Sequence, residues 1–305
     1  MTTPATLPGG YSRRRLSDVE AVFDPQNNMV GILDEDGSWS NLPRLSSDGQ
    51  SLVSGDGNLF LPSAHPKYHF MGSARAQTAD ETVFRDLVNT NNGVFGTHLS
   101  AANAWANIAS GYVSTLNPAG AAEESCIRIP APSFDMQSGE ALLIFWSGVV
   151  TPEGSDVGFM GTSISSSASG VRIQVKSSGG VATTLYDGAG NSSFGPTSAG
   201  AFVTSTLTNF AIWLDGQGEW IAQWVNGSIA HSQAIVKRNT LSADTFGIGK
   251  ATPNAVSTDG IASKTLAFHM LKWGENDAKP SIAKLSAAVS ALNRNPLSAI
   301  AAGAL

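Results

Sequence analysis

The stretch Asn209-Phe-Ala-Ile-Trp-Leu-Asp-Gly-Gln-Gly-Glu-Trp-Ile-Ala-Gln-Trp-Val-Asn-Gly-Ser-Ile229 decides the fold of this chain of 305 residues. Two apolar, aromatic-rich runs flank Asp215-Gly-Gln-Gly218, whose glycines can take the positive φ values of a tight hairpin turn. Asn226-Gly227 supplies a second turn. Both faces of the return run, Trp220–Val225, carry apolar side chains. We therefore expect a β-hairpin that lies inside a sheet rather than at its edge.

From Lys67 onward the chain is a series of short strand-like runs divided by Gly, Ser, Asn and Asp. Val171–Lys176 alternates strictly, which is typical of a strand with one buried and one wet face. Only 14% of residues are charged and 32 are glycine, a composition typical of turn-rich β proteins. The fold class predicted is all-β, a two-sheet antiparallel jelly-roll sandwich. Besides the hairpin, the predicted strands are 68–71, 82–87, 93–96, 126–129, 141–150, 157–161, 171–176, 181–186, 201–206, 231–236, 245–248 and 265–273.

Two segments break this strand pattern. Ile282, Leu285, Val289 and Leu292 recur at steps of three and four, which predicts a short amphipathic helix near the C-terminus. Pro280 suits its first turn, and residues 293–296 end it. Within the strand series, 103–112 is either a short helix or an irregular loop.

The first 64 residues differ from the rest. Residues 1–12 are rich in Pro, Thr and Gly, and strand candidates at 19–23, 29–33 and 38–42 are separated by Asp- and Asn-rich turns. Such a small meander cannot bury a core of its own. We therefore predict two domains, an N-terminal attachment arm and β-meander with its linker at 1–64, and the sandwich with its C-terminal helix and tail at 65–305.

The hairpin, its Trp-Val-Asn-Gly ending and the strand-then-helix order at 265–296 resemble the laminin-G and concanavalin A-like jelly-roll domains. The resemblance covers about Lys67 to Pro296 and implies a lectin-like or glucanase-like fold. A second resemblance rests on Val22-Phe-Asp-Pro25, Val30-Gly-Ile-Leu33 and Asp36-Gly-Ser-Trp39. These segments look like those that precede the receptor-binding or hydrolase domains of bacteriophage tail and capsid-attached proteins.

Several classes of function find no support in the sequence. The formal net charge is −6 and the only basic cluster is Arg13-Arg14-Arg15, so a nucleic-acid partner is not expected. That triplet is either a solvated part of the arm or an attachment contact to an acidic partner. No apolar run has membrane-spanning length, and the N-terminus lacks the pattern of a signal peptide. The single cysteine, Cys126, precludes an internal disulfide.

The sequence lacks the catalytic motifs that an enzyme of this fold class would carry. A laminarinase-type glucanase would carry two carboxylates on one strand in a Glu-x-Asp-x-x-Glu pattern, and this sequence has no such run. The elbow of serine hydrolases and the phosphate-binding loop of nucleotide-binding proteins are also missing. The five histidines show no metal-ligand spacing on a helix. We therefore expect a protein that is not an enzyme and has no cofactor.

Ligand-binding candidates come from the resemblance, because concanavalin-like domains often carry a calcium or carbohydrate site in their loops. Matching loops are 187–191 and 254–259, with Asp187, Asn191, Asn254 and Asp259 as oxygen-bearing residues. Asp and Asn are equally typical of ordinary turns, so the sequence does not show whether these loops bind a metal. Calcium is the one candidate. Trp220 and Trp224 share one face and either line a groove for a sugar ring or cover the sheet.

These features favour a non-enzymatic structural protein of a virion, either a tail or capsid fibre or a capsid decoration. Its partners would be other virion proteins, further copies of itself in a homo-oligomer, and a host surface glycan, with no nucleic acid or membrane. Two alternatives stay open, a polysaccharide depolymerase and a free bacterial carbohydrate-binding module.

Overall fold

The computed structural model describes residues 67–74, 82–88, 91–116, 125–130, 139–152, 154–162, 169–187, 191–194, 202–216, 220–234, 245–251, 260–297, 300 and 305, with the backbones of six short strands between residues 12 and 53. The chain divides into two compact units, Met1–Leu61 and Pro62–Leu305.

The first unit contains an antiparallel meander, as the turn-rich sequence predicts. Its strands follow one another in chain order: β1 (Ser12–Leu16), β2 (Val19–Phe23), β3 (Met29–Leu33) and β4 (Trp39–Asn41). Two further strands, β5 (Arg44–Leu45) and β6 (Leu52–Val53), pair with each other.

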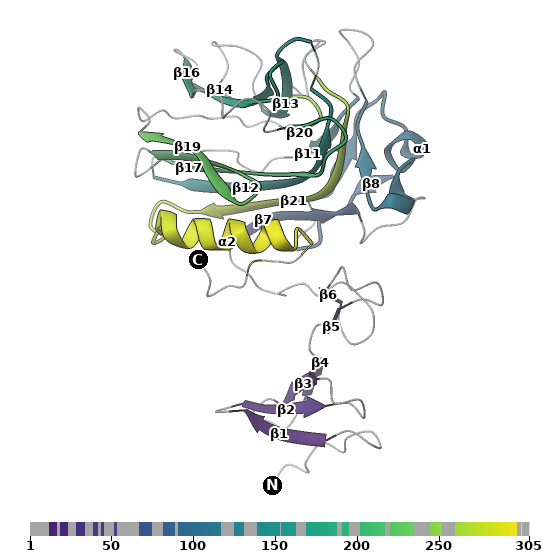
Figure 1. Cartoon of the computed structure of the whole chain (residues 1–305), viewed down its shortest axis with the longest axis vertical. Coiled ribbons are helices and arrows are strands. Elements are labelled where there is room, and N and C mark those ends of the chain that lie inside the picture. Colours follow the sequence, from purple (N-terminus) through teal and green to yellow (C-terminus); the bar gives the residue numbers. More distant parts are fainter. Residues whose placement is uncertain are drawn as a thin grey trace. The chain divides into compact units, whose positions relative to one another are not determined.

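The second unit is a sandwich of two antiparallel sheets (Figure 1). The seven-stranded sheet has the order β10-β21-β12-β17-β18-β19, and β7 also pairs with β21. Its strands are β7 (Tyr68–Ser73), β10 (Val113–Ser114), β12 (Ala141–Val150), β17 (Thr208–Asp215), β18 (Trp220–Val225), β19 (Ser228–Ala234) and β21 (Ser263–Trp273). The predicted hairpin is β17 and β18, and both strands lie inside the sheet, as expected.

The eight-stranded sheet has the order β16-β15-β14-β13-β20-β11-β9-β8. Its strands are β8 (Val83–Phe84), β9 (Gly93–Phe95), β11 (Ile127–Ile129), β13 (Val157–Gly161), β14 (Ser169–Val175), β15 (Val181–Asp187), β16 (Asn191–Phe194) and β20 (Phe246–Ile248). The alternation predicted for β14 is present, because Val171, Ile173 and Val175 are buried while Arg172 and Gln174 are partly exposed.

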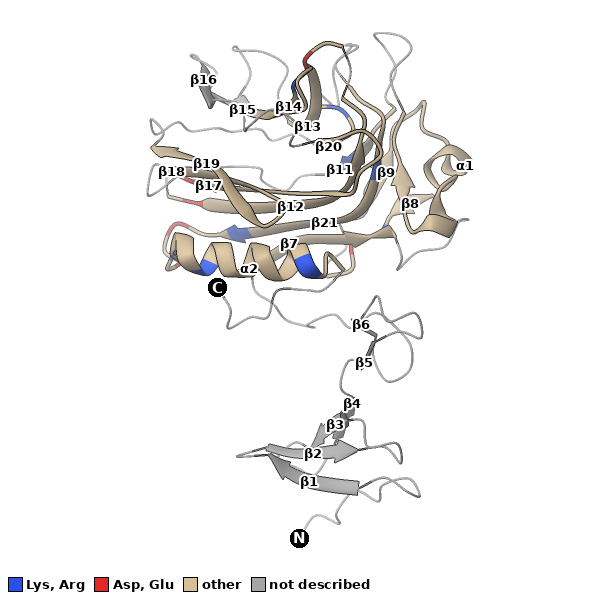
Figure 2. Cartoon of the chain, in the orientation of Figure 1, with Lys and Arg blue, Asp and Glu red and all other residues tan. Residues whose placement is uncertain are grey.

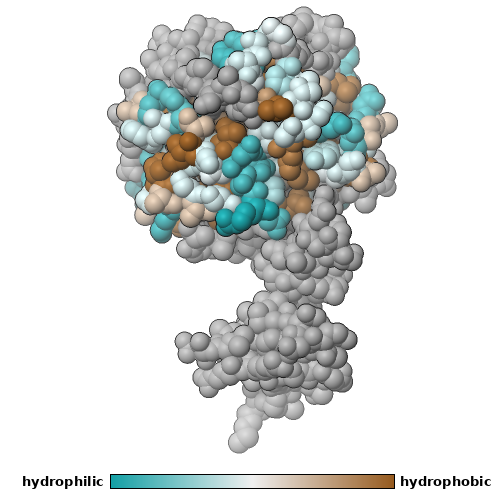
Figure 3. Space-filling model, in the orientation of Figure 1, coloured by the Kyte–Doolittle hydropathy of each residue, from teal (hydrophilic) through white to brown (hydrophobic). Residues whose placement is uncertain are grey.

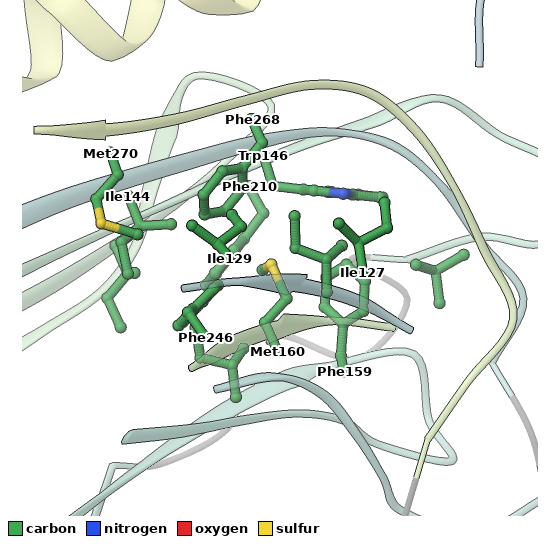
Figure 4. Close-up of a cluster of buried hydrophobic side chains, with 14 of the residues drawn as sticks. Ile127, Ile129, Ile144, Trp146, Phe159, Met160, Phe210, Phe246, Phe268 and Met270 are labelled. Carbon is green, nitrogen blue, oxygen red and sulfur yellow. The ribbon is translucent and has the colours of Figure 1, made fainter. Parts of the chain in front are cut away.

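The core fills the space between the two sheets. Trp146 lies at its centre, with its ring 4.8 Å from that of Phe159 and 5.9 Å from that of Phe202. Figure 4 shows Trp146 and Phe210 from one sheet facing Ile127 and Phe159 from the other. The indole nitrogen of Trp146 donates a hydrogen bond to Thr265 Oγ1 at 3.0 Å, so its polar atom is satisfied within the core.

The predicted C-terminal helix is present as α2 (Ile282–Arg294). Ser281 caps it, and its hydroxyl accepts a hydrogen bond from the backbone N–H of Lys284 at 3.3 Å. Its buried stripe is Leu285, Ala288, Val289 and Leu292. The segment 103–112 contains both of its alternatives, since α1 (Ala101–Ala104) is followed by the 3-10 turn η2 (Ile108–Ser110).

Turn chemistry explains one confirmed and one wrong prediction. Asn226 and Gly227 both have positive φ, 49° and 83°, so this pair forms the tight turn expected between β18 and β19. The predicted strand at 201–206 is wrong for 202–206, which forms bends and a turn with Ser205 at φ 59°. Its threonines and valine favour strand structure, yet Phe202 turns into the core while Val203 stays 52% exposed.

Candidate functional site

The structure describes the side chains of only some of the ligand-binding residues predicted from the sequence. Asp187 is the last residue of β15 and Asn191 the first of β16. Their side chains, together with Asn254 and Asp259, lie outside the residues that the structure describes, as do the side chains of the attachment residues Arg13, Arg14 and Arg15 in β1. Their roles therefore stay predictions.

Trp220 and Trp224 point to the same side of the seven-stranded sheet, as predicted, but only one of them reaches the surface. Trp220 is partly exposed, and its indole nitrogen donates to Ser232 Oγ at 2.9 Å. Trp224 is fully buried, and its indole nitrogen donates to Ser286 Oγ of α2 at 3.1 Å. The expectation that Trp224 binds a ligand is therefore wrong, because α2 covers its ring. Trp224 therefore covers the sheet, which is the second of the two roles expected for it.

The outer face of the seven-stranded sheet is occupied by α2 (Figure 1). Asn209 Nδ2 of β17 donates to Asn293 Oδ1 of α2 at 2.8 Å, and Ser290 Oγ donates to the carbonyl of Gly227 at 3.4 Å. The helix thus crosses the hairpin that the sequence singles out, and this face serves the packing of the fold.

Beside α2, a buried hydrogen-bond chain fastens the C-terminal segment to the same face. His269 Nε2 lies 2.8 Å from the carbonyl oxygen of Pro296, which only accepts, so Nε2 carries the proton. Nδ1 is then the acceptor, and Tyr68 donates to it at 3.0 Å. The backbone N–H of Ile300 donates to the Tyr68 hydroxyl at 2.9 Å. Burial lowers the pKa of His269 to about 4 and raises the pKa of Tyr68, so both groups stay neutral at pH 7.

The eight-stranded sheet presents a different outer face. Directly opposed residues of antiparallel strands point to the same side, and the register sets one continuous row across all eight strands. From β8 to β16 the row runs Val83, Val94, Arg128, Gly247, Gly161, Arg172, Thr184 and Ser193. The alternate residues Ile127, Ile129, Val171 and Ile173 lie in the core, so the row faces outward.

We name the segment Arg128–Gly247–Gly161–Arg172 of this row the arginine row. Three strand spacings separate its two arginines, which puts their Cα atoms about 14 Å apart. Both arginine side chains are partly exposed, and the two positions between them carry no side chain. The two glycines and Thr184 are buried, so Arg128 and Arg172 are the members of this stretch that reach the surface.

The glycine at 161 is fixed by the backbone. Its φ is 150°, and a Cβ atom there would lie 2.2 Å from the carbonyl oxygen of Val171. A side chain at this position would force β13 and β14 apart. The close approach of the two strands therefore requires glycine here.

The described surface around the sandwich is sparsely charged (Figure 2). In the view of Figure 3, apolar and polar residues alternate in small groups. The large apolar side chains that are most exposed are Val94 of β9, Val203 and Leu207 of the segment before β17, and Ile229 of β19. On this sparsely charged surface, the strand pairing places two partly exposed arginines, Arg128 and Arg172, on the same face of the sheet.

A second polar contact lies inside the sandwich. Gln223 of β18 is fully buried, and its Nε2 donates to Thr183 Oγ1 of β15 at 2.6 Å. On the neighbouring edge strand, His231 Nε2 lies 2.8 Å from Gln233 Oε1. The Gln223–Thr183 contact joins the two sheets, so it has a structural role.

The described residues contain neither a metal-binding cluster nor a membrane-spanning helix. No three His, Cys, Asp or Glu side chains in these ranges come close enough together to hold a metal ion. Among the helices described, none has the length and apolar character needed to cross a membrane.

Comparison with known proteins gives likeness at the level of fold. No protein-family model and no curated protein sequence matches the chain. The binding domain of botulinum neurotoxin serotype D superposes with a TM-score of 0.51 at 10% identity, covering 76% of this chain and 52% of that one. The binding domain of Paraclostridial mosquitocidal protein 1 gives 0.51 at 12% identity, covering 75% and 52%.

A smaller domain matches less well. The CBM40 domain of the Ruminococcus gnavus IT-sialidase, in a structure bound to alpha2,3 sialyllactose, gives a TM-score of 0.40 at 14% identity and covers 49% of this chain and 82% of that one. The two toxin binding domains have the same β-sandwich fold as this chain, and none of these likenesses supports the expected resemblance to bacteriophage proteins.

Proposed function

We propose that the sandwich is a non-catalytic saccharide-binding module whose binding surface is the outer face of the eight-stranded sheet. The observation that carries this proposal is the arginine row, whose partly exposed Arg128 and Arg172 put guanidinium N–H groups on this face, with the exposed Val94 beside Arg128. Such donors suit the hydroxyl and ring oxygens of a sugar lying flat on the sheet. On the opposite outer face, α2 covers the sheet at Trp224.

The fold is compatible with this role, since the two solved structures with TM-scores of 0.51 are named as binding domains. A binding module accords with the alternative of a carbohydrate-binding module more closely than with a virion fibre. Trp220, with its partly exposed ring, remains a candidate for stacking on a sugar at a separate position.

A glycan array tests the proposal. We expect the purified chain to bind a subset of oligosaccharides, and Val94→Trp, which places a large ring in the row beside Arg128, to abolish that binding. Val203→Tyr, at an exposed position outside the row, is the matched control and should bind normally. Arg128→Gln, which removes a partly exposed guanidinium of the same row, is the second blocking variant. Wild-type binding by both blocking variants would place the site elsewhere. Release of new reducing ends from a bound polysaccharide would instead identify a depolymerase.

For the first unit we propose an attachment role, in a virion or another assembly. Its support is the division of the chain into two compact units and the small size of the β1–β4 meander, which needs a partner to bury apolar surface. We expect residues 1–61 to be cut by protease in the isolated chain and protected in the assembly, with Arg13–Arg15 contributing a salt-sensitive share. Equal resistance in an isolated monomer would contradict an attachment role.

A further inference from the structure

We propose that the segment containing Pro296, Leu297 and Ile300, which we name the latch, is docked on the seven-stranded sheet at neutral pH and is released when His269 takes up a proton. Its release uncovers part of the outer face of β7 and β21 while the two sheets of the sandwich stay packed together. This inference concerns a conformational change and is independent of saccharide binding.

The first step is the way in which the latch is held. Among the described residues, its hydrogen bonds to the sheet are two, from His269 Nε2 to the carbonyl of Pro296 and from the backbone N–H of Ile300 to the hydroxyl of Tyr68. The Tyr68 hydroxyl donates in turn to Nδ1 of His269, which joins the two contacts into one chain. A change in the protonation of His269 therefore acts on both contacts.

The second step is the packing of the latch, which is separate from that of the main core. Leu297 forms a small apolar cluster with Leu266, Ala267 and Tyr112, whereas the large cluster fills the space between the two sheets. In the part of the chain that the structure describes, the latch pairs with no strand. Undocking therefore leaves the core and the strand pairings in place, so it needs less free energy than unfolding of the whole sandwich.

The third step is the chemistry of the imidazole. A neutral ring with its proton on Nε2 donates to Pro296 and accepts from Tyr68, which is the arrangement observed. A second proton turns Nδ1 into a donor, so the hydroxyl hydrogen of Tyr68 loses its acceptor and a charge is placed among buried groups. Undocking exposes the ring to water, which solvates this charge. Protonation therefore favours the released state.

In the described part of the chain, no charged side chain contacts His269 to offset this effect. Phe145 of β12 lies edge-on to the imidazole, with ring centroids 5.5 Å apart. Tyr68 of β7 stays neutral because burial raises its pKa. Arg294, the basic residue in the last turn of α2, is exposed. Burial is the main cause that lowers the pKa of His269, and the contact with Pro296 opposes it.

Hydrogen exchange of the Ile300 amide in the full chain tests the proposal, with each rate corrected for the intrinsic rate at that pH. The pKa of His269 is about 4 in the docked state and near 6.5 once the ring is exposed. Lowering the pH from 7 to 4 should therefore reduce the protection of this amide by about a hundredfold. The amides of β12 and β17 should keep their protection over the same range.

Three variants make the measurement specific. His269→Gln can donate to Pro296 and accept from Tyr68 but does not titrate, so its Ile300 protection should not vary with pH. His231→Gln, which removes a partly exposed histidine of β19, is the matched control and should respond as the wild type does. Tyr68→Phe removes the acceptor of the Ile300 N–H and should lower the protection already at pH 7, with β12 unchanged.

Constant protection of Ile300 in the wild type between pH 7 and 4 would overturn the proposal. Loss of protection to the same extent in β12 would overturn it too, because that result indicates unfolding of the whole sandwich. A pH response that persists in His269→Gln would assign the effect to another group. If this variant is already undocked at pH 7, the wild-type profile decides, because uptake of one proton by histidine requires an onset near pH 6.5 and a fall of at most about tenfold per pH unit.

Discussion

Replacing Trp146 by alanine is expected to lower the free energy of unfolding of the sandwich by about 3–5 kcal/mol. The indole is fully buried, lies edge-on to Phe159 with ring centroids 4.8 Å apart, and donates to Thr265. Its removal leaves a cavity between the sheets and an unpaired hydroxyl partner. Urea unfolding followed by circular dichroism, with the transition of the sandwich unit analysed by itself, measures the effect.

Two variants make this measurement specific. Trp146→Phe keeps a ring in the core but loses the hydrogen bond to Thr265 and part of the volume, so its loss should be clearly smaller than that of alanine. Val203→Ala changes an exposed apolar side chain and should cost less than about 0.5 kcal/mol. A loss below about 1.5 kcal/mol for Trp146→Ala would show that this ring does not organise the core.

Acidification is expected to destabilise the sandwich by up to about 3 kcal/mol through His269 alone, between pH 6.5 and about 4. The folded state holds this histidine neutral with a pKa of about 4, whereas the unfolded chain protonates it near 6.5. The contribution is therefore fully present above pH 6.5, is lost as the pH falls toward 4, and levels off below. Protonation of Nδ1 also removes the acceptor that Tyr68 uses.

The comparison with His269→Gln isolates this effect. A glutamine amide can donate to Pro296 and accept from Tyr68 but does not titrate, so the variant should lack the slope between pH 6.5 and 4. Asp156 and Asp277, whose pKa values are lowered by hydrogen bonds from Lys176 and Lys67, contribute in both proteins and cancel in the difference. Identical pH profiles for wild type and variant would show that His269 is not held neutral.

Local patterns in the sequence predict most of the sandwich. The limits of β12 and β13 are those expected from their apolar runs, and the spacing of Leu285, Val289 and Leu292 predicts α2. β10 and β16 were missed because Val113–Ser114 and Asn191–Phe194 have no apolar run of their own. The segment 202–206 has the composition of a strand but pairs with no strand among the described residues. Residue propensities do not show whether a partner strand is present to form hydrogen bonds.

The candidate site was not predictable in the same way. Alternation in Cys126-Ile-Arg-Ile129 and in Val171–Lys176 puts Arg128 and Arg172 on the wet faces of their strands. That both join one row depends on pairings between strands far apart in sequence. Trp224 shows the reverse problem, because its strand pattern is compatible with an open groove and only the packing of α2 closes it. The periodicity of one strand predicts which face a residue is on, but not which distant strands pair or in what register. A site formed by several strands is therefore not predicted from it.

The position of β21 determines when this protein can fold during synthesis. Although it is the last of the strands that the structure describes, it lies in the interior of its sheet, with β12 on one side and β7 and β10 on the other. At ribosomal rates of roughly 5–20 residues per second, the emerging β7 waits roughly 10–40 seconds for its partner. Until then the apolar edges of β7 and β12 have no neighbour in the chain, and chaperones that shield such edges are expected to bind the nascent protein.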